Sequence, residues 1–211
     1  MTEAPRRTDH LIYGAPDLER GRDEIERRLG VSPAVGGRHP QYGTRNALLA
    51  IGEETYLEVM APDPELPVPG DGTLFGLDEM EEPRFVAWAL RCEEIESVAD
   101  RAGAEGVGLG PVEEGSREQP DGTVLSWRLT DPRATPLDGV VPFLIAWGST
   151  PHPAKSAPRG GELVELRVEH PRPGAVRDAL AVLGVEMAVE QGDRPQLVAA
   201  VRTDRGRVEL R

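Results

Sequence analysis

The sequence predicts an α+β protein made of three copies of one unit, in which a strand is followed by a helix and three further strands. Apolar runs and amphipathic segments recur in this order three times. The three helices start near Asp17, Glu94 and Pro173, at nearly equal intervals along the chain. Two segments rich in proline and glycine, residues 62–83 and 150–161, separate the copies. The alternative, one α+β domain with coincidental spacing, fits three agreeing copies less well.

The first unit, residues 8–61, opens with an apolar run at residues 10–14 that is typical of a strand. Asp17 is suited to cap a helix, whose apolar residues share one face between Leu18 and Leu29. Gly30 is the kind of residue that ends a helix. Three further strands are expected around residues 34–37, 46–51 and 55–60.

The second and third units repeat this order. In the second, residues 84–149, we expect a strand at 85–90, a helix closed by Gly103 and Gly106, and strands at 107–113, 124–129 and 142–147. In the third, residues 162–211, we expect a strand at 163–168, a helix closed by Gly184, and strands at 185–190, 197–201 and 207–210. One such unit has too few helices to cover its sheet, so it needs a partner unit.

The units therefore predict two regions. Residues 1–154 would form one domain from the paired first and second units, and residues 162–211 would form a third βαβββ module. We expect the third module to pack against the first two or to pair with its own copy in a homodimer, because an odd number of half-domains leaves one without a partner.

Composition excludes several classes of protein. With 37 Asp and Glu against 24 Lys and Arg, the net charge is −13, which disfavours nucleic acids and anionic membrane surfaces. The acidity favours solubility, and it is also typical of a high-salt cytoplasm. No apolar run is long enough to cross a membrane, and the single cysteine, Cys92, rules out an internal disulfide. We expect a cytoplasmic protein.

Several residues carry a resemblance to a known family. Asp9 and His10 open the first strand, and the closing strand of the second unit is the run at residues 142–147. The most specific match lies in residues 39–58, which contain His39-Pro40, Gly43-Thr44, Asn46 and Tyr56-Leu57-Glu58. In these features the chain resembles the glyoxalase-like proteins of the vicinal oxygen chelate superfamily. The match is good over residues 8–154, and the third unit matches in shape only.

The resemblance implies a fold and a site. The paired modules would form a cupped mixed sheet with helices outside, and the concave face would hold a small-molecule ligand. In metal-dependent members a divalent ion is held by the first and fourth strands of each module. His10 and Glu58 match these ligands in the first module, and imidazole with carboxylate suits Zn, Fe, Mn or Ni. Glu58, once released from such an ion, would be a general base.

The second module departs from this pattern. Alignment of the two units places Ala87 opposite His10 and Ile145 opposite Glu58, and neither side chain binds metal. His39 would supply a third metal ligand, from an unusual place. Metal dependence therefore stays open: the cofactor is a divalent metal or none.

Other residues are candidates for binding substrate. His39, Thr44, Arg45 and Asn46 would form a polar rim, although Thr and Asn are also common in turns. Tyr56 shares the face of Glu58 because side chains alternate along a strand. Phe143 and Trp147 are predicted to line the apolar side of the cup; the alternative is that they pack in the core. His152 and His170 precede prolines and are interpreted as loop residues.

Two functions follow from the same fold. The first is a glyoxalase-like small-molecule enzyme of lyase or isomerase type. The second is a metal-free protein that binds or sequesters a small ligand in the same cup. A third alternative is a structural or interaction domain in which the cup is vestigial and binds no ligand. Fold alone does not choose between them.

Overall fold

A computed structural model describes residues 3–70, 72–118, 124–134 and 136–211. The described residues repeat the predicted β-α-β-β-β order three times. The first unit is β1 (Thr8–Gly14), α1 (Leu18–Leu29), β2 (Ala34–His39), β3 (Thr44–Ala50) and β4 (Tyr56–Pro62). The second is β5 (Arg84–Arg91), α2 (Ile95–Ala104), β6 (Val112–Glu118), β7 (Val124–Thr130) and β8 (Phe143–Ala146). The third is β9 (Glu162–His170), α3 (Pro173–Val182), β10 (Ala188–Gln191), β11 (Gln196–Thr203) and β12 (Gly206–Leu210).

Two predicted strands begin too early. The strand expected at residues 107–113 starts only at Val112, because Gly110 has a left-handed φ of 71° and Pro111 cannot donate to a ladder. The strand expected at 185–190 starts at Ala188. His170 was expected in a loop but is the last residue of β9. The three helices lie where their spacing predicted.

Helix α1 shows how local sequence sets an element. Asp17 accepts a hydrogen bond from the backbone N–H of Arg20 at 2.8 Å, as an N-cap residue does. Gly30 ends the helix with a φ of 87°, a conformation that costs glycine little. The buried face contains Ile25 and Leu29, and it packs on the sheet.

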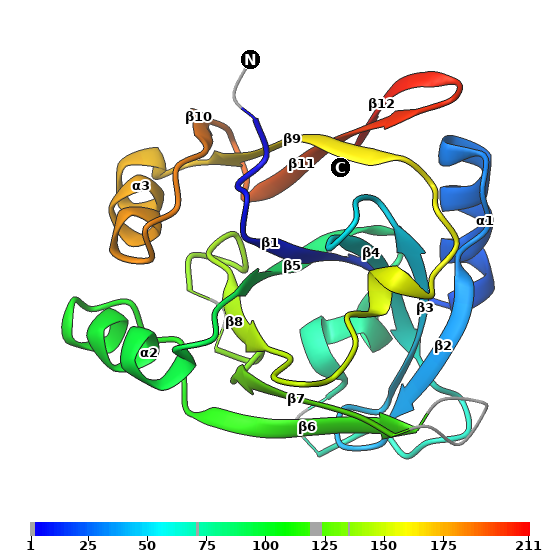
Figure 1. The fold of residues 1–211 in the computed structure, drawn as a ribbon, viewed down its shortest axis with the longest axis horizontal. Helices are drawn as coiled ribbons and strands as arrows, with labels where there is room; N and C mark the ends of the chain where they lie inside the picture. The colour runs from blue at the N-terminus through cyan, green and yellow to red at the C-terminus, as the bar shows by residue number, and fades with distance from the viewer. Residues whose placement is uncertain (1–2, 71, 119–123, 135) are drawn as a thin grey trace.

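The first two units build one curled, eight-stranded sheet with the order β2-β3-β4-β1-β5-β8-β7-β6. The two units meet where β1 and β5 pair antiparallel. Figure 1 shows the sheet curving round until its edge strands β2 and β6 approach each other, with α1 and α2 on the outside. The predicted cupped α+β fold is therefore confirmed.

Alternation along the strands separates two apolar layers. In β4, Leu57 and Val59 join the outer layer beneath the helices, whereas Tyr56, Glu58 and Met60 face the inside of the cup. This is the assignment that the period of two predicted.

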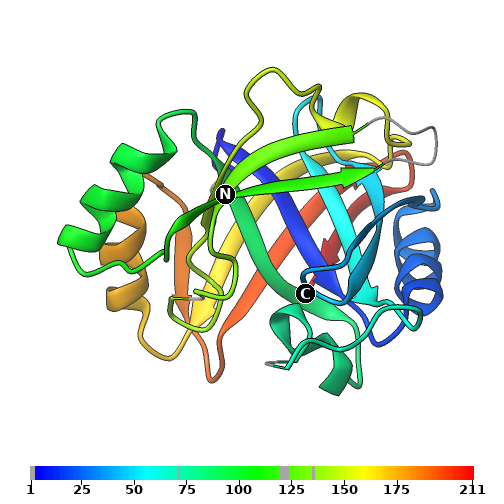
Figure 2. The ribbon, with the colours of Figure 1, turned by 90° about the horizontal axis from the view of Figure 1, so that it is seen from below.

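The third unit has the predicted order of elements but a different sheet. Strand β9 pairs parallel with β10 and antiparallel with β11, so the order is β10-β9-β11-β12. In the first two units the first strand instead pairs with the fourth. Figures 1 and 2 show this smaller sheet lying across the outer face of the cup at β1 and β5.

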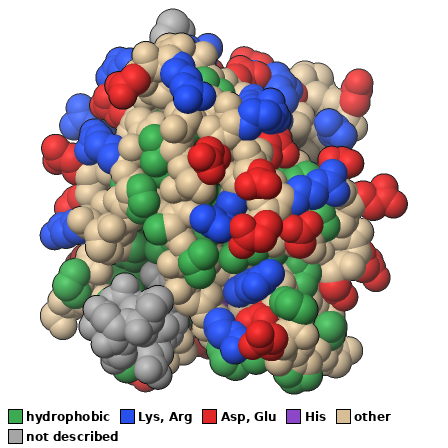
Figure 3. Space-filling model, turned by 90° about the vertical axis from the view of Figure 1, so that its right-hand side faces the viewer, with side chains coloured by type: hydrophobic (Ala, Val, Ile, Leu, Met, Phe, Trp, Pro, Cys, Tyr) green, Lys and Arg blue, Asp and Glu red, His purple; other side chains and the backbone are tan. Residues whose placement is uncertain are grey.

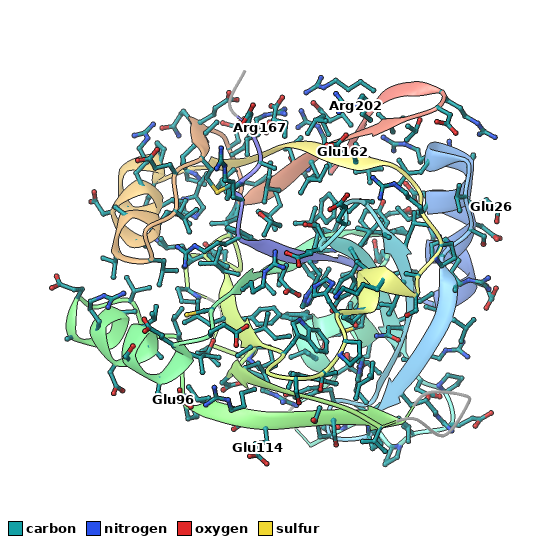
Figure 4. The ribbon with its side chains drawn as sticks, viewed as in Figure 1. Glu26, Glu96, Glu114, Glu162, Arg167 and Arg202 are labelled. Carbon is teal, nitrogen blue, oxygen red and sulfur yellow. The ribbon has the colours of Figure 1, made fainter. Side chains whose placement is uncertain are left out.

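The two sides of the smaller sheet differ in chemistry. Its inner side, including Leu166 and Val168, belongs to the same apolar cluster as the outer layer of the cup. Its outer side carries charged residues, including the ion pair of Arg202 with Glu162 (Figure 4). Arg167, also on that side, lies among four glutamates, of which Glu209 is 3.1 Å away.

The surface carries mixed charges. Figure 3 shows acidic and basic side chains interspersed on the face that includes α1, where Arg22 pairs with Glu19 and Arg28 with Glu24. None of the described helices is long and apolar enough to span a membrane.

Both linkers enter the cup. The first contains a short helical segment, Leu74–Glu79, whose Leu74 and Leu77 pack against the inner apolar layer. The second contains the short helix Pro153–Lys155, and its Ala154 packs there too. The linkers therefore help to shape the site as well as to connect the units.

Candidate functional site

The inner face of the cup encloses a small cavity with one polar and one apolar wall. The space open to the centres of water-sized molecules is about 50 Å³. The residues that line it are His10, Ile12, His39, Tyr42, Asn46, Tyr56, Glu58, Met60, Leu74, Trp127, Leu129, Pro132, Phe143, Ile145 and Trp147. Of the nine residues predicted for the site, His10, His39, Asn46, Tyr56, Glu58, Phe143 and Trp147 come together here.

His10 lies at the centre of the polar wall and is 3% exposed. Its Nδ1 is 2.8 Å from Oδ1 of Asp9, and its Nε2 is 3.6 Å from Oε2 of Glu58. The ring stacks on Tyr56 with centroids 4.6 Å apart and meets the edge of Phe143 at 5.6 Å. The imidazole is thus held between two carboxylates and two aromatic rings.

Asp9 reaches the site because β1 contains a β-bulge. Thr8 is opposite Leu90 and His10 is opposite Ala89, so Asp9 is an extra residue on β1. Its carboxylate is fully buried and also accepts a hydrogen bond from Nε1 of Trp147 at 3.1 Å.

The surroundings keep Asp9 ionised. Burial by itself would raise the pKa of Asp9, but the hydrogen bonds that it accepts from His10 and His152 hold the pKa well below its usual value. Asp9 is therefore a fixed negative charge beneath the site.

Glu58 is positioned by a side chain from the neighbouring strand. Nδ2 of Asn46, on β3, donates to Oε1 of Glu58 at 2.6 Å, and Oδ1 of Asn46 accepts from the backbone N–H of Gly37 at 2.8 Å. Because these bonds fix the orientation of the amide, Asn46 presents a donor to the carboxylate. The other oxygen of Glu58 faces His10.

His39 and Thr44 form the polar end of the cup next to the β2–β3 turn. His39 is buried, and its Nδ1 lies 3.2 Å from Oγ1 of Thr44. Thr44 contacts His39, which lines the cavity, but Thr44 does not line the cavity itself. The guanidinium of Arg133 lies over the ring of the lining residue Tyr42, 5.0 Å from its centroid.

Arg45 lies outside the cup. Alternation along β3 turns Asn46 inward, so Arg45 faces the outer side together with Ala47 and Leu49. It lines a separate surface groove that also contains Arg38 and Asp63. The structure therefore does not bring Arg45, which was predicted for the polar rim, to the cavity.

The second unit supplies the apolar wall, and its register corrects one predicted correspondence. Ile12 pairs with Glu58 across β1 and β4, whereas Ala89 pairs with Phe143 across β5 and β8. Equivalent positions of β1 and β5 are 77 residues apart, so Ala89 corresponds to Ile12. Phe143 is therefore the counterpart of Glu58, and Ile145 is that of Met60. Ala87 remains the counterpart of His10. The predicted correspondence of Ile145 with Glu58 came from aligning the two closing strands with each other, whereas the structure pairs each closing strand with the first strand of its own unit.

Comparisons with known proteins agree with this geometry. A family model described as a glyoxalase-like domain matches residues 8–184. The chain belongs to this family. The predicted resemblance to the glyoxalase-like proteins is thereby confirmed. A search of curated proteins found no significant match.

Several solved structures are similar to this glyoxalase-like protein. A hypothetical protein from Staphylococcus aureus matches with a TM-score of 0.67 and 17% identity, over 92% of this chain and 91% of that one. A mutant of 4-hydroxymandelate synthase from Streptomyces coelicolor matches with a TM-score of 0.50 and 16% identity, over 98% of this chain and 62% of the synthase. Methylmalonyl-CoA epimerase from Mycobacterium tuberculosis matches with a TM-score of 0.43 and 19% identity, over 67% and 87%.

The donor set of this glyoxalase-like protein does not fit a divalent ion. Nε2 of His10 and Oε2 of Glu58 are two converging donors, whereas a protein site for such an ion ordinarily supplies three or four. The counterparts in the second unit, Ala87 and Phe143, offer none. Across the described ranges, no group of three His, Cys, Asp or Glu side chains is arranged to hold a metal, so His39 does not complete the set.

The facing side chains of His10 and Glu58 are of the kinds that transfer protons. Because Nδ1 of His10 donates to Asp9, Nε2 of the neutral ring would present a lone pair to the Glu58 carboxylate. A proton carried by either group removes this repulsion. The pair then consists of one acid and one base side by side, which is the arrangement that general acid–base catalysis uses.

Sequence reasoning missed several residues of the site, among them Asp9, His152 and Tyr42. Asp9 was noted only as part of a motif, since alternation alone would turn it away from His10. His152 does lie outside the regular strands, as expected, but it is buried and bonded to Asp9. Tyr42 carries no sequence signal beyond its place in the 39–58 motif.

Proposed function

We propose that this glyoxalase-like protein is a metal-independent enzyme of isomerase or lyase type that moves a proton on a small molecule. The observation that carries the proposal is the position of His10, held by Asp9 on one side and facing Glu58 at 3.6 Å on the other. A substrate carbonyl oxygen would accept a hydrogen bond from protonated Nε2 of His10. The Glu58 carboxylate would take the proton from the adjacent carbon.

The size of the cavity limits the substrate. A site needs roughly 10–15 Å³ of this kind of space for each water molecule, so a volume of about 50 Å³ encloses a fragment of about three to five heavy atoms. The aromatic wall of Phe143, Trp127 and Trp147 favours a flat or apolar body, and the polar wall favours a carbonyl or hydroxyl group. Small uncharged aldehydes and ketones combine these properties.

The test follows solvent deuterium into candidate substrates. Proton NMR in D₂O would measure loss of the C–H signal next to the carbonyl across a panel of small aldehydes and ketones. We expect exchange with the unaltered protein and a loss of at least about 100-fold in Glu58→Gln, which keeps the shape but not the base. Glu114→Gln, on the exposed side of β6, is the matched control. Equal exchange in both variants would refute the assignment of Glu58.

Metal independence is tested on the same samples. Elemental analysis of the purified protein should find no stoichiometric transition metal, and a strong chelator should leave the exchange rate unchanged. Exchange that is lost with chelator and regained with one particular ion would refute the metal-independent mechanism.

The second candidate is a metal-free binding protein. The specific observation in its favour is Phe143, an apolar ring at the place that corresponds to Glu58, which makes half of the cup a surface for packing. This candidate predicts saturable shifts in the NMR spectra of ligands without deuterium exchange. It also predicts that Glu58→Gln weakens ligand binding by less than the roughly 100-fold loss of exchange expected for the enzyme.

A further inference from the structure

Both oxygens of the Asp9 carboxylate are occupied by side-chain donors from different parts of the chain. Oδ1 lies 2.8 Å from Nδ1 of His10, and Oδ2 lies 3.2 Å from Nε2 of His152. Nε1 of Trp147 approaches both oxygens, at 3.3 and 3.1 Å. The direction of the carboxylate, and so of the hydrogen bond to His10, depends on all three donors.

The hydrogen bonds of His152 determine its tautomer. Nδ1 accepts a hydrogen bond from the backbone N–H of Ala154 at 3.2 Å, so it carries no proton. The proton of the ring is therefore on Nε2, which donates to Asp9. His152 is a neutral donor whose orientation is set by the turn in which it lies.

The segment that carries His152 is fastened to the cup. The backbone N–H of Ala50, on β3, donates to the carbonyl of Pro158 at 2.8 Å, and the N–H of Gly160 donates back to the carbonyl of Ala50 at 2.8 Å. The ring of His152 also meets Tyr56 edge-on, with centroids 5.5 Å apart, and Tyr56 stacks on His10.

We propose that His152 is a positioning residue for His10. By donating to Asp9 and packing against Tyr56, it keeps the Nδ1–H of His10 on Asp9 and the Nε2 of His10 facing Glu58. The connection between the second and third units thus takes part in the site. The predicted effect of His152 on catalysis rests on the proposed function. Its predicted effect on the His10 ring is independent of any substrate.

Two variants of His152 separate its donor role from its local structural role. In His152→Asn the side-chain oxygen replaces Nδ1 as acceptor for the Ala154 N–H, but the amide is too short to reach Asp9. In His152→Gln the amide N–H reaches the place of Nε2 and donates to Asp9. His170→Asn is the control: His170 is also buried, its Nδ1 accepts from the N–H of Arg172 at 2.9 Å, and its Nε2 faces Asp138 outside the cup.

The readout is the tautomer of His10, measured from side-chain ¹⁵N shifts of the full-length protein. The measurement is made at a pH high enough for the His10 ring to be neutral. There we expect one Nδ1–H form in the unaltered protein, a mixture of forms in His152→Asn, and a return to one form in His152→Gln, with no change in His170→Asn. Deuterium exchange should fall about tenfold in His152→Asn and recover in His152→Gln. A single unchanged tautomer in His152→Asn overturns the proposal, whatever the activity. Tautomer changes without any exchange activity in the unaltered protein would support it and overturn the proposed enzyme.

Discussion

Asp9 is a fully buried carboxylate that three N–H donors surround, at the base of a site made from short polar contacts. Removing the charge would leave donors without a matching acceptor, which costs about 1–3 kcal/mol for a buried group. The same bonds give Asp9 its lowered pKa. Stability and the orientation of His10 therefore depend on one side chain.

Asp9→Asn is expected to lower the free energy of unfolding by about 1–3 kcal/mol at pH 7. Because the folded-state pKa of Asp9 lies below the unfolded value of about 3.9, the charge stabilises the fold above about pH 4, and this contribution is lost as the pH falls through the folded-state pKa. The difference between the two proteins should therefore shrink by about 1 kcal/mol between pH 6 and pH 3. Urea unfolding at both pH values measures it, and a difference that stays constant with pH would contradict the assignment.

At the scale of the element, helix α1 approaches its strand so closely that one position has no room for a side chain. A Cβ atom on Gly21 would lie 2.6 Å from Cγ1 of Val59 on β4 and 2.7 Å from Cβ of Ala15. Both neighbours are buried, so neither can move freely. Close packing, and not helix propensity, determines the residue here.

Gly21→Ala is expected to destabilise the protein by about 1–3 kcal/mol, although alanine usually favours a helix. The matched control is Gly103→Ala in α2, where a new Cβ meets nothing within 4 Å and should stabilise by up to about 1 kcal/mol. Thermal unfolding of both variants gives the comparison. Equal stabilisation by both would show that α1 does not pack on β4 this closely.

Individual elements also show how far the sequence could predict the site. Alternation in β4 correctly placed Tyr56 and Glu58 inside the cup, because the period of two is a local property of a strand. The bulge in β1 was not predictable, since it exists only relative to β5, and with it the role of Asp9 was missed. Arg45 was assigned from its motif, whereas its place on the outer face follows from alternation along β3.

At the scale of the molecule, one apolar cluster connects all three units. Leu166 of β9 is completely buried in the cluster that includes Leu57 and Trp88 of the first two units. Further ties cross the same boundary, since Arg7 donates to the carbonyl of Leu183 at 2.8 Å and Arg28 donates to that of Glu209. We infer that the three units unfold together.

Leu166→Ala should cost about 2–5 kcal/mol, as removal of a fully buried leucine does. All three tryptophans lie in the second unit: Trp127 and Trp147 line the cup, and Trp88 lies in the cluster shared with the third unit, which itself contains no tryptophan. We expect the fluorescence midpoint in urea to fall together with the circular dichroism midpoint. A fluorescence midpoint that stays in place while part of the dichroism signal is lost earlier would show that residues 162–211 form an independent domain.

The pairing of β9 with β10 and β11 has a consequence for stoichiometry. Because β9 lies between β10 and β11, the third unit does not form the half-cup that each of the first two units forms. It therefore cannot complete a cup with a unit of a second chain, and the odd number of units leaves no half-cup unpaired. In the part of the chain that the structure describes, the first two units form one cup per polypeptide. Calorimetric titration with a ligand that binds in the cup should accordingly saturate at one molecule of ligand per chain.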